Sequence, residues 1–272
     1  MQRWLNLAVW LFFAATVYLI LVEAVWPWVH LPDLGNIGFT LVFVLFAILH
    51  CAVTEGWRRT GVFFLISALV SYTMEEVGVR TGAIYGPYHY SDMLGAKLGH
   101  VPILIPLAWF MMIYPSWMVA RCIVTQRIVV RQRLEGAHSL GVITALAVVA
   151  AFVMTAWDTV MDPGMAAAGN WVWEQGGPYF GVPLRNYFGW MLTTFFVYWS
   201  AGFAWRGVQR TGSATPGFEA LPVIVYAFFA LRYVMAGSIP ALQLVALFSM
   251  GLPALLALMQ IATKKNEESG EA

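Results

Sequence analysis

Charged residues are scarce in this chain, at 11% of its 272 residues. Soluble domains carry about 25% charged residues, so this low content excludes an ordinary soluble domain. Hydrophobic residues make up 60% of the chain and the mean hydropathy is +0.72, which predicts an integral membrane protein. The formal net charge of +1 lacks the strong basic excess of nucleic-acid-binding proteins, so we expect no nucleic-acid partner.

Cysteine is scarcer still, and both cysteines, Cys51 and Cys122, fall inside apolar segments. This placement excludes a disulfide framework or a metal cluster. The sequence also lacks a phosphate-binding glycine loop, a dinucleotide fingerprint and a GxSxG turn. The pair Asp158 and Asp162 has the spacing of a magnesium-diphosphate motif, but such a site needs more carboxylates and basic groups nearby. We therefore expect no metal and no cofactor.

Apolar segments of spanning length dominate what is present. A transmembrane helix needs about 20 apolar residues, and the windows that approach this length are 4–25, 37–53, 61–77, 102–123, 139–157, 187–205, 221–236 and 239–263. The predicted fold is therefore an all-α bundle of about eight transmembrane helices. We expect a single domain over residues 1–263 and a disordered cytoplasmic tail over residues 264–272.

Lysine and arginine concentrate in alternate connections, which predicts the orientation of the bundle. The residues on the predicted cytoplasmic side are Arg3, Arg58, Arg59, Arg121, Arg127, Arg131, Arg133, Arg206, Arg210, Lys264 and Lys265. Both termini should therefore face the cytoplasm, in what we expect to be a bacterial inner membrane. The two long outer connections, residues 79–101 and 159–186, are rich in Gly, Pro, Tyr and Trp. Because they are too apolar for free aqueous loops, we expect them to fold over a cavity as a lid.

Two adjacent acids, Glu75 and Glu76, lie near the outer end of the third segment. An acid at the centre of a membrane helix costs roughly 2.5–3.5 kcal/mol, so an intramembrane acid indicates a functional site. Neighbours on a helix point about 100° apart, so only one of them should face a cavity. Tyr72 lies four residues before Glu76 and is a candidate to hydrogen-bond it. Alternatively, both acids simply reach the outer interface.

Asp158 and Asp162 are four residues apart, so they share a face if the fifth helix continues to Asp162. The proline that follows, Pro163, predicts that the helix ends at this point. Two carboxylates held close together in apolar surroundings cannot both ionise cheaply, so one should stay protonated, as a general acid requires. Alternatively, Asp162 forms a turn and Asp158 pairs with Arg185 or Arg232. Arg232, inside an apolar helix, should find an acid, either for structure or for function.

Aromatic residues accumulate beside these acids, and their faces stabilise cations. The collection suits a reaction that passes through a carbocation, although aromatic residues also anchor membrane interfaces. His89 is a possible proton relay. The candidate catalytic residues are Glu75, Glu76, Asp158 and Asp162. The candidate substrate-binding residues are Tyr72, Tyr85, Tyr88, His89, Tyr90, Trp109, Trp157, Trp173, Tyr179, Asn186 and Arg232.

Residues 61–190 carry a combination of short motifs. They include Glu75-Glu76-Val77-Gly78, Tyr85-Gly86-Pro87-Tyr88-His89-Tyr90, Trp157-Asp158, Met161-Asp162-Pro163, Trp171-Val172-Trp173 and Tyr179-Phe180-Gly181-Val182-Pro183. In these motifs the chain resembles the integral-membrane carotenoid biosynthesis proteins that include the carotenoid 1',2'-hydratases. The resemblance implies addition of water to the terminal double bond of an acyclic carotenoid such as lycopene, without a redox cofactor. The substrate would enter from the bilayer.

Such a hydration needs a carboxylic acid for C2', aromatic faces around the tertiary cation at C1', and an ordered water beside a base. We expect Asp158 or Asp162 to be the acid and Glu75 or Glu76 to position water, with the reverse assignment open. A carotenoid cyclase would begin with the same protonation. A transporter of small solutes, with the acids and Arg232 along its path, and a structural scaffold are the alternatives of other classes.

Overall fold

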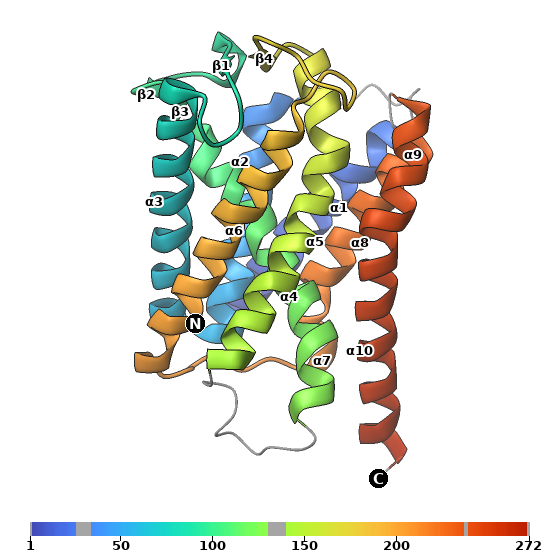
Figure 1. Cartoon of the computed structure of the whole chain (residues 1–272). Coiled ribbons are helices and arrows are strands. Elements are labelled where there is room, and N and C mark those ends of the chain that lie inside the picture. The colour runs from blue at the N-terminus through green and yellow to red at the C-terminus, as the bar shows by residue number, and fades with distance from the viewer. Residues whose placement is uncertain (1, 26–33, 130–139, 237–238, 271–272) are drawn as a thin grey trace.

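Long apolar helices make up most of the computed structural model, which describes residues 2–25, 34–129, 140–236 and 239–270 (Figure 1). The helices are α1 (Gln2–Val25), α2 (Gly35–Glu55), α3 (Trp57–Thr81), α4 (Leu104–Val129), α5 (Leu140–Ala167), α6 (Leu184–Ala204), the short α7 (Pro216–Glu219), α8 (Leu221–Ala236), α9 (Pro240–Ala246) and α10 (Leu252–Gly270). A π-helical turn, η4 (Leu247–Gly251), joins α9 to α10. Each predicted apolar window coincides with a helix.

The described part of the chain contains 7 helical segments that are long and apolar enough to cross a membrane, counting α9 to α10 as one. The eighth long helix, α6, has the length but a lower hydropathy, because residues such as Arg185, Asn186 and Thr193 interrupt its apolar sequence. The prediction of an all-α polytopic membrane bundle is confirmed. The division into one domain and a disordered tail stays a prediction, and α10 continues to Gly270.

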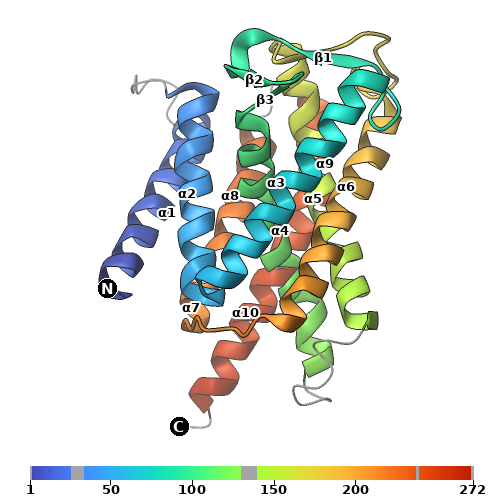
Figure 2. The ribbon, with the colours of Figure 1, turned by 90° about the vertical axis from the view of Figure 1, so that its left-hand side faces the viewer.

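The two long connections meet above one end of the bundle, as predicted for a lid (Figures 1 and 2). Strand β1 (Tyr88–Tyr90) from the first connection pairs antiparallel with β4 (Trp171–Trp173) from the second, with Tyr88 opposite Trp173 and Tyr90 opposite Trp171. A short 3₁₀ turn, η1 (Asp92–Leu94), and a second small ladder of β2 (Lys97–Leu98) and β3 (Val101–Pro102) complete the lid. Backbone pairing thus satisfies some of the polar groups of the two largely apolar connections.

Pro163 does not end α5, contrary to the prediction. The helix continues through it to Ala167. Proline has no N–H for the carbonyl four residues earlier, which here belongs to Thr159. The Tyr179 hydroxyl donates to that carbonyl at 3.1 Å. Because a side chain of the lid replaces the missing donor, α5 passes the proline and carries Asp158 and Asp162 on one face.

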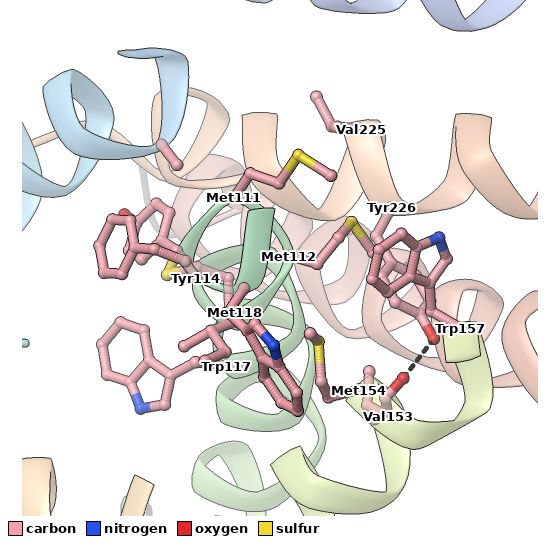
Figure 3. Packing of buried hydrophobic residues seen from close by; sticks show 14 of the residues in the cluster. Met111, Met112, Tyr114, Trp117, Met118, Val153, Met154, Trp157, Val225 and Tyr226 are labelled. Carbon is pink, nitrogen blue, oxygen red and sulfur yellow. Dashed lines mark hydrogen bonds between the residues drawn. The ribbon is translucent and has the colours of Figure 1, made fainter. Parts of the chain in front are cut away.

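A buried apolar core lies among the helices and supports the lid from below. Figure 3 shows Met111 and Met112 of α4 beside side chains of α5 and α8, whereas Tyr114 points to the other side of α4. The Tyr226 hydroxyl of α8 donates to the Val153 carbonyl at 2.8 Å, which ties α8 to α5. The core therefore holds α4 and α8 against α5, the helix that carries Asp158 and Asp162.

The opposite end of the bundle is closed by ion pairs. The buried carboxylate of Glu55 contacts Arg59 at 2.9 Å and Arg121 at 3.0 Å, and Glu219 bridges Arg121 and Arg210. These three arginines belong to the predicted cytoplasmic set, and the structure places them and the predicted outer acids at opposite ends of the bundle. Arg131 and Arg133 of the same set lie outside the described residues.

Candidate functional site

A cavity of about 820 Å³ lies beneath the lid. It is lined by residues of α1, α2, α3, α4, α5, α6, α8 and the lid. Those on which the chemistry depends are Glu75, Tyr85, Tyr88, Tyr90, Trp109, Trp157, Asp162, Trp171, Trp173, Asn186, Trp190 and Arg232. The structure therefore brings most of the predicted site residues into one cavity at the predicted end of the bundle.

Glu75 of α3 faces this cavity and is 4% exposed. Its Oε2 accepts hydrogen bonds from the hydroxyls of Tyr88 and Tyr90, the latter at 2.8 Å, and its Oε1 accepts one from the indole N–H of Trp109 at 3.0 Å. Strand β1 aims both tyrosines inward because alternate residues of a strand point to the same side. Three donors from the lid and α4 thus hold one buried carboxylate.

The two tyrosines keep their protons in this setting. Burial raises the pKa of Tyr88 and of Tyr90 well above the ordinary value for a phenol, and the charge of Glu75 raises both further. They therefore act as hydroxyl donors to the carboxylate.

Asp158 and Asp162 of α5 are joined by the amide of Asn186 from α6. Asn186 Nδ2 donates to Asp158 Oδ2 at 2.8 Å and to Asp162 Oδ2 at 2.6 Å. The indole N–H groups of Trp171 and Trp173 both donate to Asp162 Oδ1, at 2.6 and 3.3 Å. Asp162 lines the cavity, whereas Asp158 lies one helical turn deeper and outside the described lining. Asp162 is therefore the member of the pair that can touch a substrate.

Aromatic rings form the walls between Glu75 and the aspartates. Trp109 stacks on Trp190 with ring centroids 4.1 Å apart, and Trp157 meets Trp190 edge-on at 6.0 Å. Tyr88 packs against Trp173 at 4.9 Å. Such an enclosure can stabilise a positive charge in the cavity.

Tyr85 is fixed between two helices by two glycines. A Cβ atom at Gly78 of α3 would lie 2.6 Å from the Tyr85 ring, and one at Gly189 of α6 would lie 2.5 Å from it. The Tyr85 hydroxyl bonds Thr193 of α6 at 2.8 Å. The absence of side chains at these two glycines therefore makes room for a buried ring at the cavity.

The cavity has a deep end and a mouth. Glu75, Asp162 and Asn186 are buried, whereas the lining residues Leu34 and Met93 are 47% and 59% exposed. The mouth thus opens beside the start of α2 and the lid, among apolar side chains. Arg232 of α8 is half-buried in the lining.

The other predicted site residues point elsewhere. Glu76 accepts bonds from the backbone N–H of His100 at 2.9 Å and contacts its Nδ1 at 2.8 Å. As predicted, only one of the two adjacent glutamates faces the cavity. The predicted bond from Tyr72 to Glu76 is wrong, because the Tyr72 hydroxyl donates to the Leu98 carbonyl. His89 points outward beside Glu174, since it alternates with Tyr88 and Tyr90, and Tyr179 bonds Thr159.

Two features of the site were not predicted from the sequence. The indole N–H groups of three tryptophans donate hydrogen bonds to buried acids. From the aromatic content we predicted only that ring faces would stabilise a cation. Asn36 of α2 donates to Asn170 at 2.8 Å and so ties the mouth to the lid. No spacing in the sequence links these asparagines, which are 134 residues apart.

Comparisons with known proteins indicate the family of the chain. A family model described as carotenoid biosynthesis protein matches residues 35–262. The chain is 32% identical over 171 residues to a bisanhydrobacterioruberin hydratase of Haloarcula japonica, an alignment that covers 60% of this chain and 53% of that protein. The chain thus spans about half the length of this curated relative. No solved structure matches the chain.

Proposed function

The chain belongs to the carotenoid biosynthesis protein family, and we propose that it is a hydratase that adds water to the terminal C1'-C2' double bond of an acyclic carotenoid end. The observation that carries this proposal is the cavity that Asp162, Glu75 and several aromatic rings line together. The similarity to a protein named as a hydratase supports it.

The aspartate pair supplies the proton. One amide contacts both carboxylates, so the two acids are too close to ionise together without a large cost, and one proton stays on the pair. Asp162 faces the cavity and transfers this proton to C2', which leaves a tertiary cation at C1'. The walls of Trp109, Trp157 and Trp190 surround that cation.

Glu75 takes the role of base. Burial opposes ionisation of Glu75, whereas its three donors stabilise the ionised carboxylate that a base requires. A water oxygen bonds to C1' while its proton passes to Glu75, and that proton later returns to the aspartate pair. The sum is one alkene and one water consumed and one tertiary alcohol formed, with no oxidation or reduction.

The apolar mouth suits a substrate that is dissolved in lipid. The end group would enter beside Leu34 and Met93, and the rest of the polyene would stay in the bilayer. By the distribution of lysine and arginine, we place this mouth on the non-cytoplasmic side of a bacterial plasma membrane.

Incubation of the purified protein with lycopene in ¹⁸O-labelled water tests the proposal. We expect label in a product hydroxyl group, and we expect Asp162→Asn to abolish it while Glu76→Gln retains it. A cyclised product of unchanged mass would assign the same protonation to a cyclase instead.

A further inference from the structure

Two buried polar atoms belong to residues of α5 and α6 that do not line the cavity. Asp158 Oδ1 and the Tyr187 hydroxyl are both inaccessible, and neither has a hydrogen-bond partner among the described residues. Asp158 is fully buried. Because an unsatisfied buried polar group costs about 1–3 kcal/mol, such atoms usually bind water.

Tyr187 lies in the first turn of α6, next to Asn186, whose amide contacts both Asp158 and Asp162. Neither Tyr187 nor Asp158 belongs to the described lining of the cavity. The aspartate pair thus has one member that lines the cavity, Asp162, and one that does not, Asp158.

A row of aromatic rings leads from Tyr187 to the outer surface. Tyr187 meets the half-buried Tyr179 edge-on at 5.2 Å, and Tyr179 meets Phe180 at 4.8 Å. Phe180 is 43% exposed. Tyr179 is bonded to the Thr159 carbonyl of α5 and Tyr187 belongs to α6, whereas the apolar mouth lies beside α2.

We propose that Asp158 Oδ1 and the Tyr187 hydroxyl hold a water molecule at a station on the route by which water, the second substrate, reaches the cavity. This inference rests on the proposed hydratase function. It gives the two substrates separate entrances: the carotenoid enters from lipid at Leu34 and Met93, and water enters along Tyr179 and Tyr187. A closed lid then excludes bulk water from the cation, which keeps competing reactions low.

Tyr187→Phe tests the station because it removes one of its two polar atoms and keeps the ring. In D₂O we expect the hydrated product to form at least tenfold more slowly, with carotenoid affinity unchanged. Protonation by Asp162 continues, so cations that are not captured lose a proton and return to alkene. The ratio of deuterium at C2' of the unreacted carotenoid to hydrated product should therefore be higher for Tyr187→Phe than for the wild-type protein. Tyr18→Phe, on the half-exposed face of α1, is the control and should behave as wild type.

Any of three results would contradict the proposed water site. The first is a wild-type rate of hydration in Tyr187→Phe, and the second is an equal fall of hydration and deuterium uptake in that variant. The third is a high-resolution map of the full chain without ordered density between Asp158 Oδ1 and the Tyr187 hydroxyl. Because that map uses the wild-type protein, it tests whether the water is bound even if the variant fails to fold. A wild-type protein that forms no hydroxyl product would instead refute the hydratase function itself.

Discussion

The Tyr179 hydroxyl and the Thr159 carbonyl form a hydrogen bond that joins the lid to the helix of the aspartates. Thr159 lies next to Asp158, and Pro163 next to Asp162. The bond occupies the carbonyl that Pro163 leaves without a helix donor. It therefore supports α5 at the turn that carries both acids, and it couples the position of the lid to the geometry of the site.

Tyr179→Phe should destabilise the protein by about 1 kcal/mol, the net value of a typical hydrogen bond. Pro163→Ala restores a backbone N–H that can bond Thr159, so the same Tyr179→Phe change should cost less in that background. Unfolding of the four variants in detergent, analysed as a double-mutant cycle, measures the difference. Equal costs in both backgrounds would show that the hydroxyl does not replace the helix bond.

Gly189→Ala should destabilise the bundle by roughly 1–3 kcal/mol, because the added methyl group would displace the Tyr85 ring and overpack a buried contact. Gly61→Ala is a matched control in α3. A Cβ at Gly61 has nothing within 4 Å, and alanine favours a helix over glycine by up to about 1 kcal/mol. In thermal unfolding, Gly189→Ala should therefore have a lower melting temperature than Gly61→Ala. Similar melting temperatures of the two variants would contradict the tight fit at Tyr85.

The apolar windows were long enough to predict every long helix, and the Gly, Pro and aromatic content of two connections predicted the lid. The identity of the acid that faces the cavity could not be predicted, because a shift of one residue turns a helix face by about 100°. The end of α5 was predicted wrongly at Pro163, since the compensating donor, Tyr179, lies on another segment. Asn186 was a candidate for substrate binding, but its bridge between the two aspartates depends on the packing of α5 against α6.

Glu75→Gln should reduce hydration by about 10²-fold or more, within the range for loss of an acid–base group. The amide cannot accept a proton from water, and its NH₂ group would face the donors Tyr88 or Trp109. Glu76→Gln changes the neighbouring residue in the same way, but its contacts are with His100, so activity should stay within about twofold. Product formation by pigment chromatography, with membrane insertion checked by blotting, compares the pair. Equal losses would assign Glu75 a structural role.

Asn186→Ala should impair both stability and turnover, because it removes the NH₂ group that contacts both aspartates. We expect a loss of about 1–3 kcal/mol in unfolding free energy, the cost of leaving buried polar groups unsatisfied. A second change, Asp158→Asn, should recover much of that stability. The new amide lies one helical turn from Asp162, can donate to it, and removes the competing carboxylate. Turnover should not recover, because the pair then has no second carboxyl group to keep a proton on Asp162. Recovery of full turnover by the double variant would show that Asp158 contributes only packing, and that Asp162 alone binds the proton.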